Sequence, residues 1–183
     1  GSGNDLIQTI SAQRPTLYTG GQNGYPRVKF GPGWTNMVAS MTQAQPFSVF
    51  LVAKLNAAGT STNFAVWIWS TTDNWQITTD DSDLTPARGT PRTVAGVADP
   101  GQTVELPYGT LALISARYNN GAAMSFAFQR QVSQTANPGL GGLGTSISVG
   151  GASAAGTPNF DGDFYEILIY NSSLSAANTH LVE

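Results

Sequence analysis

Short apolar runs separated by turn residues dominate the sequence and predict a protein built from β-strands. The runs that fit strands are residues 26–30, 46–55, 64–70, 75–78, 90–97, 103–106, 110–118, 122–130, 145–149 and 163–170. Asn120-Gly121 lies between two of them and is a strong hairpin signal, because a type I′ turn needs positive φ at both central positions. Regular strands without helices between them predict antiparallel sheets packed as a sandwich or barrel.

The alternation of side chains predicts which faces meet the core. In residues 46–55 one face is apolar and is assigned to the core: Phe47, Val49, Leu51, Ala53 and Leu55. Residues 64–70 are bulky on both faces, with Phe64, Val66 and Ile68 opposite Ala65, Trp67 and Trp69. Only one face of a sandwich sheet meets the core, so one of these two sets lies on an outer face. A tryptophan pair there is covered by a loop, contacts a partner or lines a ligand groove.

The one predicted helix lies at the end of the sequence. Ser175 is a suitable N-cap, and Ala176 and Ala177 after it favour a helix. Leu181 and Val182 give this segment a modest apolar side. We expect a short helix packed against an edge of the sandwich.

Composition and charge narrow the function. The 183 residues fit a single domain spanning residues 1–183. Eight Lys and Arg against 11 Asp and Glu give a net charge of −3, which argues against nucleic-acid binding. No apolar run approaches the roughly 20 residues of a membrane span. The absence of cysteine excludes thiol catalysis and cysteine-based zinc sites, and it leaves the compartment open.

Six segments, in order, resemble one known family. They are GSGNDL at 1–6 with QRPTL at 13–17, GYPRVKF at 24–30, PFSVFLV at 46–52, ISVGG at 147–151 and FDGDFYEILIYN at 160–171. Together they resemble the concanavalin A-like (laminin G-like) jelly-roll domains of phage structural or fibre proteins and bacterial surface proteins. The resemblance implies an all-β fold: an antiparallel two-sheet jelly-roll sandwich with a short C-terminal helix.

The sequence departs from this family at its beginning. Family members usually start with one more strand before the point where residue 1 stands. We therefore expect this sequence to be part of a longer chain. Without that strand, an exposed sheet edge would need cover from elsewhere, such as a neighbouring subunit.

Asp161, Asp163 and Glu166 superficially echo the acidic pattern of glycoside hydrolases that share this fold. Retaining hydrolysis needs two carboxyl groups about 5–5.5 Å apart. Regular alternation places Glu166 on the face opposite Asp161 and Asp163, so we expect a structural role for this run and no enzymatic activity. The one histidine, His180, lies on the predicted terminal helix and is expected at the surface.

One acidic cluster is a candidate calcium site. It consists of Asp73, Asp80, Asp81 and Asp83. Calcium takes six to eight oxygen ligands, many of them carboxylates from loops, so this cluster could hold it. The alternative is a solvated acidic loop between strands. No other cofactor is expected.

Two functions from different classes fit the sequence. The first is binding of a glycan or host-surface receptor through aromatic side chains, for which the candidates are Trp67, Trp69, Trp75, Tyr118 and Trp34. Ordinary packing is the alternative for each of them. The second is a structural or decoration role in a virion or on a cell surface, as an oligomer or in assembly with other structural subunits. We expect both in one virion, extracellular or cell-surface protein; the alternative is a secreted carbohydrate-binding module attached to a glycoside hydrolase.

Overall fold

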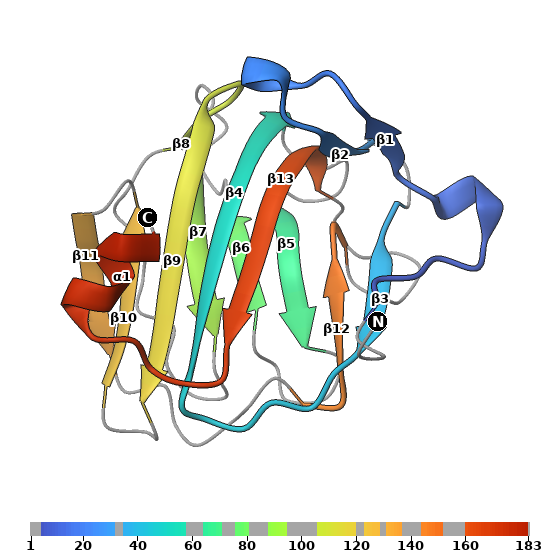
Figure 1. Cartoon of the computed structure of the whole chain (residues 1–183). Coiled ribbons are helices and arrows are strands. Elements are labelled where there is room, and N and C mark those ends of the chain that lie inside the picture. Colours follow the sequence, from blue (N-terminus) through green and yellow to red (C-terminus); the bar gives the residue numbers. More distant parts are fainter. Residues whose placement is uncertain are drawn as a thin grey trace.

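Two antiparallel β-sheets packed face to face form the protein in the computed structural model (Figure 1). The structure describes residues 5–31, 35–57, 64–70, 76–80, 88–94, 106–119, 123–128, 131–136, 144–151 and 160–182. The predicted fold class, an antiparallel sandwich with a short terminal helix, is confirmed.

The first sheet has seven strands, and its centre is built from segments far apart in the sequence. Its order is β1 (Thr16–Tyr18), β2 (Arg27–Phe30), β13 (Asp161–Tyr170), β4 (Phe47–Ala57), β9 (Leu111–Asn119), β10 (Ala123–Phe128) and β11 (Gln131–Ala136). The strand closest to the C-terminus, β13, therefore lies between two N-terminal strands (Figure 1).

The second sheet has six strands. Its order is β3 (Met37–Ser40), β12 (Ser146–Val149), β5 (Phe64–Ser70), β6 (Gln76–Asp80), β7 (Arg88–Val94) and β8 (Leu106–Pro107). Two 3₁₀ turns, Ser11–Gln13 and Gln22–Gly24, and the helix α1 (Ala176–Val182) complete the elements. Among helices in the described part of the chain, none has the length and apolar character to cross a membrane.

Ten of the strands correspond to predicted runs, and three were missed. The missed strands are β1, β3 and β11. β1 is only three residues long and fully exposed, and β11 is mostly polar, so neither carries an apolar pattern. The predicted hairpin is confirmed by the pairing of β9 with β10, in which Asn119 lies opposite Ala123. Three residues, 120–122, therefore separate the paired positions, and their conformation lies outside the described residues.

The core lies between the two sheets and confirms the predicted inner face of β4. The five β4 residues assigned to it are all buried. β9 adds Ala112, Ile114, Ala116 and Tyr118, and the second sheet contributes Ala39, Ile68, Ile77, Ile147 and Val149. Phe30, Phe160 and Phe164 pack edge-on or tilted against one another at one end of this core. Aromatic rings in such arrangements add to the stabilisation from burial alone.

The C-terminal segment is attached to the outer face of the seven-stranded sheet. The Ser48 hydroxyl donates to the Ser172 carbonyl (2.8 Å) and accepts from the Leu174 N–H (3.0 Å). The Arg117 guanidinium donates to the Leu174 carbonyl (3.1 Å). Ser175 then caps α1, as predicted, because its hydroxyl accepts the Asn178 N–H (3.2 Å).

Gly150 is predicted to be required for packing of the aromatic end of the core. It has a φ of +82°, and a Cβ there would collide with the Phe30 ring. Gly109 has a similar φ of +77° but open space around it, which makes Gly109→Ala a matched control. We expect Gly109→Ala to cost about 1–2 kcal/mol, because of its backbone conformation. Gly150→Ala should cost about 1–3 kcal/mol more, because the added methyl group would overpack the core against Phe30.

Urea unfolding of the two variants measures this difference. Equal losses of stability in both variants would show that Phe30 moves aside without cost, contrary to this prediction.

Candidate functional site

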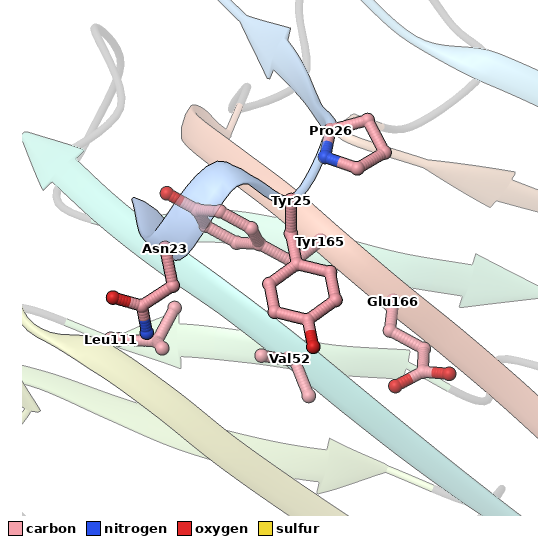
Figure 2. Close-up of a pocket in the computed structure, with 7 residues that line it drawn as sticks. All are labelled: Asn23, Tyr25, Pro26, Val52, Leu111, Tyr165 and Glu166. Carbon is pink, nitrogen blue, oxygen red and sulfur yellow. The ribbon is translucent and has the colours of Figure 1, made fainter. Parts of the chain in front are cut away.

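A pocket opens on the outer face of the seven-stranded sheet (Figure 2). Its volume is about 470 Å³, within the usual range for small-molecule sites. Seven residues line it: Asn23, Tyr25, Pro26, Val52, Leu111, Tyr165 and Glu166. Val52 and Leu111 each lie directly next to a buried core residue in their strands. Because neighbouring side chains in a strand point to opposite faces, these two face away from the core, and they form the floor of the pocket. We call this the outer-face pocket.

A β-bulge in β13 supplies one side of the outer-face pocket. Phe164 lies opposite Ala53 of β4, but Glu166 lies opposite Val52, so Tyr165 is an extra residue. A bulge bends its strand and changes the direction of the side chains that follow. Tyr165 and Glu166 consequently both line the pocket.

The bulge also places Glu166 on the opposite face of the sheet from the one expected from the sequence. Asp163 lies opposite Lys54 and Glu166 opposite Val52, and these two β4 residues share the outer face. Glu166 and Asp163 therefore lie on the same face of the sheet. The expectation of opposite faces was wrong because it assumed regular alternation through position 165.

The loop between β1 and β2 forms the opposite wall. The Gly21 N–H donates to the Tyr25 carbonyl (2.8 Å), and the Gly24 N–H donates to the Gly21 carbonyl (3.2 Å). Asn23 has a φ of 56°, which asparagine tolerates better than most residues. The loop thereby brings Asn23 and Tyr25 over the floor (Figure 2).

Gly21 allows this loop to lie directly on the sheet. A Cβ at Gly21 would collide with the Tyr25 carbonyl oxygen and would lie 3.2 Å from the Tyr165 ring. It would also lie 3.5 Å from Cδ of Arg27. A larger residue would therefore push the loop away from Tyr165, whereas the neighbouring Gly20 has open space around it.

Next to the outer-face pocket, a buried carboxylate joins three strands. Oδ2 of Asp163 lies 3.1 Å from Arg27 Nη1 and 3.2 Å from Lys54 Nζ. Asp163 is 1% exposed, and the two cations are partly exposed. The Arg27 guanidinium also lies over the Tyr18 ring, 5.0 Å from its centroid. We call Arg27, Lys54 and Asp163 the Asp163 cluster.

Asp161 lies at the start of the same strand and has a raised pKa. Burial raises the pKa of Asp161 above its usual value of 3.8, Lys29 opposes this rise, and the nearby Asp163 adds to it. Lys29 lies opposite Asp163 in the pairing of β2 with β13. Positive and negative side chains thus alternate over this part of the sheet.

One predicted binding residue belongs to the core instead. Tyr118 is 0% exposed, and its ring stacks on Phe47 with centroids 4.4 Å apart. A ring without an exposed face cannot stack on a glycan. The assignment of Tyr118 as a glycan-binding residue was therefore wrong.

The tryptophans stay untested as binding residues. Trp67 and Trp69 lie in β5, where Trp69 pairs with Ser148 and Gln76, but their side chains lie outside the described residues. Trp34 and Trp75 also lie outside them.

The same holds for the predicted calcium ligands and for the single histidine. Asp80 ends β6 opposite Phe64 and Thr90, and Asp73, Asp81 and Asp83 lie outside the described residues. Within the described part of the chain, no three acidic or histidine side chains gather as a metal site would require. His180 lies in α1, as predicted, but its side chain is outside that part.

The lining residues of the outer-face pocket were missed as binding residues. The glycine-rich segment Gly20–Gly24 is followed by an exposed tyrosine, but no binding residue was predicted there. The sequence signal that could have indicated this pocket wall is a glycine-rich segment followed directly by an aromatic residue, Tyr25.

Comparison with known proteins shows the fold. No protein-family model matches the chain, and no curated protein does either. Among solved structures, domain 4 of AbnA matches with a TM-score of 0.68 and 16% identity, over 92% of this chain and 81% of that one. AbnA is a GH43 extracellular arabinanase from Geobacillus stearothermophilus, and that structure contains arabinotriose.

Two further structures have the same fold at lower identity. A heptameric SAP-like pentraxin from Limulus polyphemus matches with a TM-score of 0.60 and 11% identity, over 97% of this chain and 79% of that one. A Trypanosoma rangeli sialidase matches with a TM-score of 0.63 and 10% identity, over 83% of this chain but 26% of that one. The chain therefore has a β-sandwich fold that also occurs in these proteins.

The Asp163 cluster is predicted to stabilise the sheet below the pocket. Asp163→Asn removes the negative charge between two cations and should cost about 2–3 kcal/mol, because both cations then lose their partner but stay partly solvated. Glu166→Gln, an exposed carboxylate on the same strand, is the control and should stay within about 0.5 kcal/mol of the native protein. Urea unfolding measures both, and similar stabilities of the two variants would contradict the prediction.

Proposed function

We propose that this protein is a carbohydrate-binding domain that holds a glycan in the outer-face pocket. The observation that carries this proposal is that the pocket combines two tyrosine rings, an amide and a carboxylate with an apolar floor. Tyr25 is 68% exposed and reaches from the loop toward Val52, between Asn23 and Glu166 (Figure 2). Aromatic rings can stack on the apolar C–H face of a sugar, while amide and carboxylate groups bind its hydroxyls.

The structural comparison supports the same class of ligand. The AbnA domain has this fold and was solved with arabinotriose. It belongs to an extracellular glycosidase, so a module attached to a glycoside hydrolase is one setting for the present domain. A virion or cell surface is the other setting predicted from the sequence, and both are extracellular.

We further propose that the domain binds without catalysis. Hydrolysis of a glycosidic bond ordinarily uses two carboxyl groups facing the same sugar. Glu166 is the one carboxylate among the residues that line the pocket. Asp163 is buried, is held by Arg27 and Lys54, and does not line the pocket.

Tyr25 is predicted to be the main contact. Tyr25→Ala removes an exposed ring that the fold does not bury, so binding of oligosaccharides should weaken roughly tenfold or more. Leu181→Ala is the control, because Leu181 is 84% exposed on α1 and does not line the pocket. Isothermal titration calorimetry with glycans selected on a glycan array measures both variants. Unchanged affinity in Tyr25→Ala would place the glycan site elsewhere, and the tryptophans of β5 would then be tested next.

A second pair of variants tests the pocket wall without removing a contact. Gly21→Ala should displace the loop from Tyr165 and weaken binding, whereas Gly20→Ala has room for its methyl group and should bind normally. Equal binding by both would show that the loop position is unimportant for the ligand.

A structural role in an assembly is the second candidate function. β1 and β3 lie at the same edge of the sandwich (Figure 1). Three large apolar side chains of this N-terminal region are exposed: Leu17 in β1, Ile7, which pairs with Val38 of β3, and Ile10, which directly precedes the 3₁₀ turn Ser11–Gln13. Exposed apolar groups at a sheet edge favour contact with another chain, and a second copy is the simplest partner.

Light scattering of the purified protein tests this candidate. Self-assembly predicts a defined multiple of 19.1 kDa. Leu17→Lys should return the protein to a monomer, because a charge at the edge opposes pairing. Leu181→Lys, at an equally exposed site on α1, should leave the assembly intact. A native mass of 19.1 kDa would contradict a role in self-assembly.

A further inference from the structure

We infer that the outer-face pocket selects uncharged sugars and rejects sugars that carry a carboxylate, with Glu166 as the residue that sets this preference. The inference rests on the proposed glycan-binding function. It follows from how the charges next to the pocket are paired.

The cations beside the pocket already have anionic partners. Arg27 and Lys54 both contact Oδ2 of Asp163, at 3.1 and 3.2 Å. Lys29 interacts with Asp161, whose pKa it lowers against the effect of burial. A sugar carboxylate would have to compete with the buried Asp163 for Arg27 and Lys54, and with Asp161 for Lys29. Arg27 and Lys54 therefore already share one anionic partner, and none of the three cations lines the pocket.

The charge that faces the pocket is negative. Glu166 is exposed and lines the pocket, and among the described residues it has no ion-pair partner. Its position depends on the bulge at Tyr165, which turns it to the same side as Tyr165 and Val52. A carboxylate accepts hydrogen bonds only, so it favours ligands that present hydroxyl donors.

The other lining groups fit the same ligand. Tyr25 and Tyr165 present rings and hydroxyls, and Asn23 presents an amide that both donates and accepts. An uncharged sugar supplies hydroxyl donors to Glu166 in charge-assisted hydrogen bonds, which are about twice as strong as neutral ones. A uronic acid supplies a second negative charge instead, and like charges at short range repel.

Matched pairs of oligosaccharides test the inference. Galactotriose and trigalacturonic acid differ only in the oxidation of C6, and mannotriose with trimannuronic acid forms a second pair. Calorimetric titration at pH 7 and low salt should show binding of an uncharged trimer at least tenfold tighter than its acidic counterpart. Added sodium chloride should narrow that ratio by screening the repulsion, without weakening binding of the uncharged trimer.

Glu166→Gln tests the residue itself. It keeps the shape of the side chain and removes its charge, so the uncharged trimer should bind roughly three to tenfold more weakly and the acidic trimer at least as well as before. The ratio between the two should fall at least fivefold. Asp5→Asn, which removes an exposed carboxylate outside the pocket, is the matched control and should leave the ratio unchanged.

The outcomes separate the inference from the function on which it rests. Equal or tighter binding of the acidic trimers by the native protein would overturn the inference and leave glycan binding intact. A native preference that Glu166→Gln does not alter would also overturn it. Failure of the native protein to bind any trimer, or any glycan of a wider array, would remove the proposed function and this inference with it. Urea unfolding of each variant confirms that it is folded.

Discussion

The extra residue at position 165 is the constraint on which the outer face of the seven-stranded sheet depends. β13 runs through that sheet between β2 and β4, so any change in its alternation affects both neighbours. Before the bulge, Phe164 packs in the core and Asp163 faces outward; after it, Glu166 again faces outward. Asp163 lies on the outer face before the bulge, and the inserted residue brings Glu166 to that face as well, so that Tyr165 and Glu166 both line the pocket.

The Asp163 cluster holds the strands on either side of this bulge in place. A bulge interrupts the regular ladder of hydrogen bonds, which loosens the pairing locally. Arg27 of β2 and Lys54 of β4 both reach the same carboxylate oxygen of β13, so one buried charge bridges three strands. Such a network costs desolvation energy, but it fixes the geometry on which the pocket floor and wall are built.

Local patterns predicted the architecture well, because most of it depends on short-range alternation. The core face of β4 follows directly from the apolar residues at every second position, and the α1 cap follows from Ser175. The pocket could not be predicted in the same way. Its lining comes from a loop and from strands β4, β9 and β13, which meet only in the folded sheet. In addition, the bulge interrupts the regular alternation of side chains that was assumed for Glu166. Tyr118 was misassigned for a different reason: the regular alternation of β9 places it on the core face with Ile114 and Ala116, and that alternation was not applied to it.

The two halves of the pocket have different origins in the chain. The floor comes from β4 and β9, which lie far apart in the sequence, whereas the wall is one continuous segment between β1 and β2, seated on the sheet through Gly21. Loops of this kind tolerate changes in sequence and length far better than the strands that carry them. The wall could therefore be replaced as a cassette, by evolution or in the laboratory, to give domains with other ligands on an unchanged sandwich.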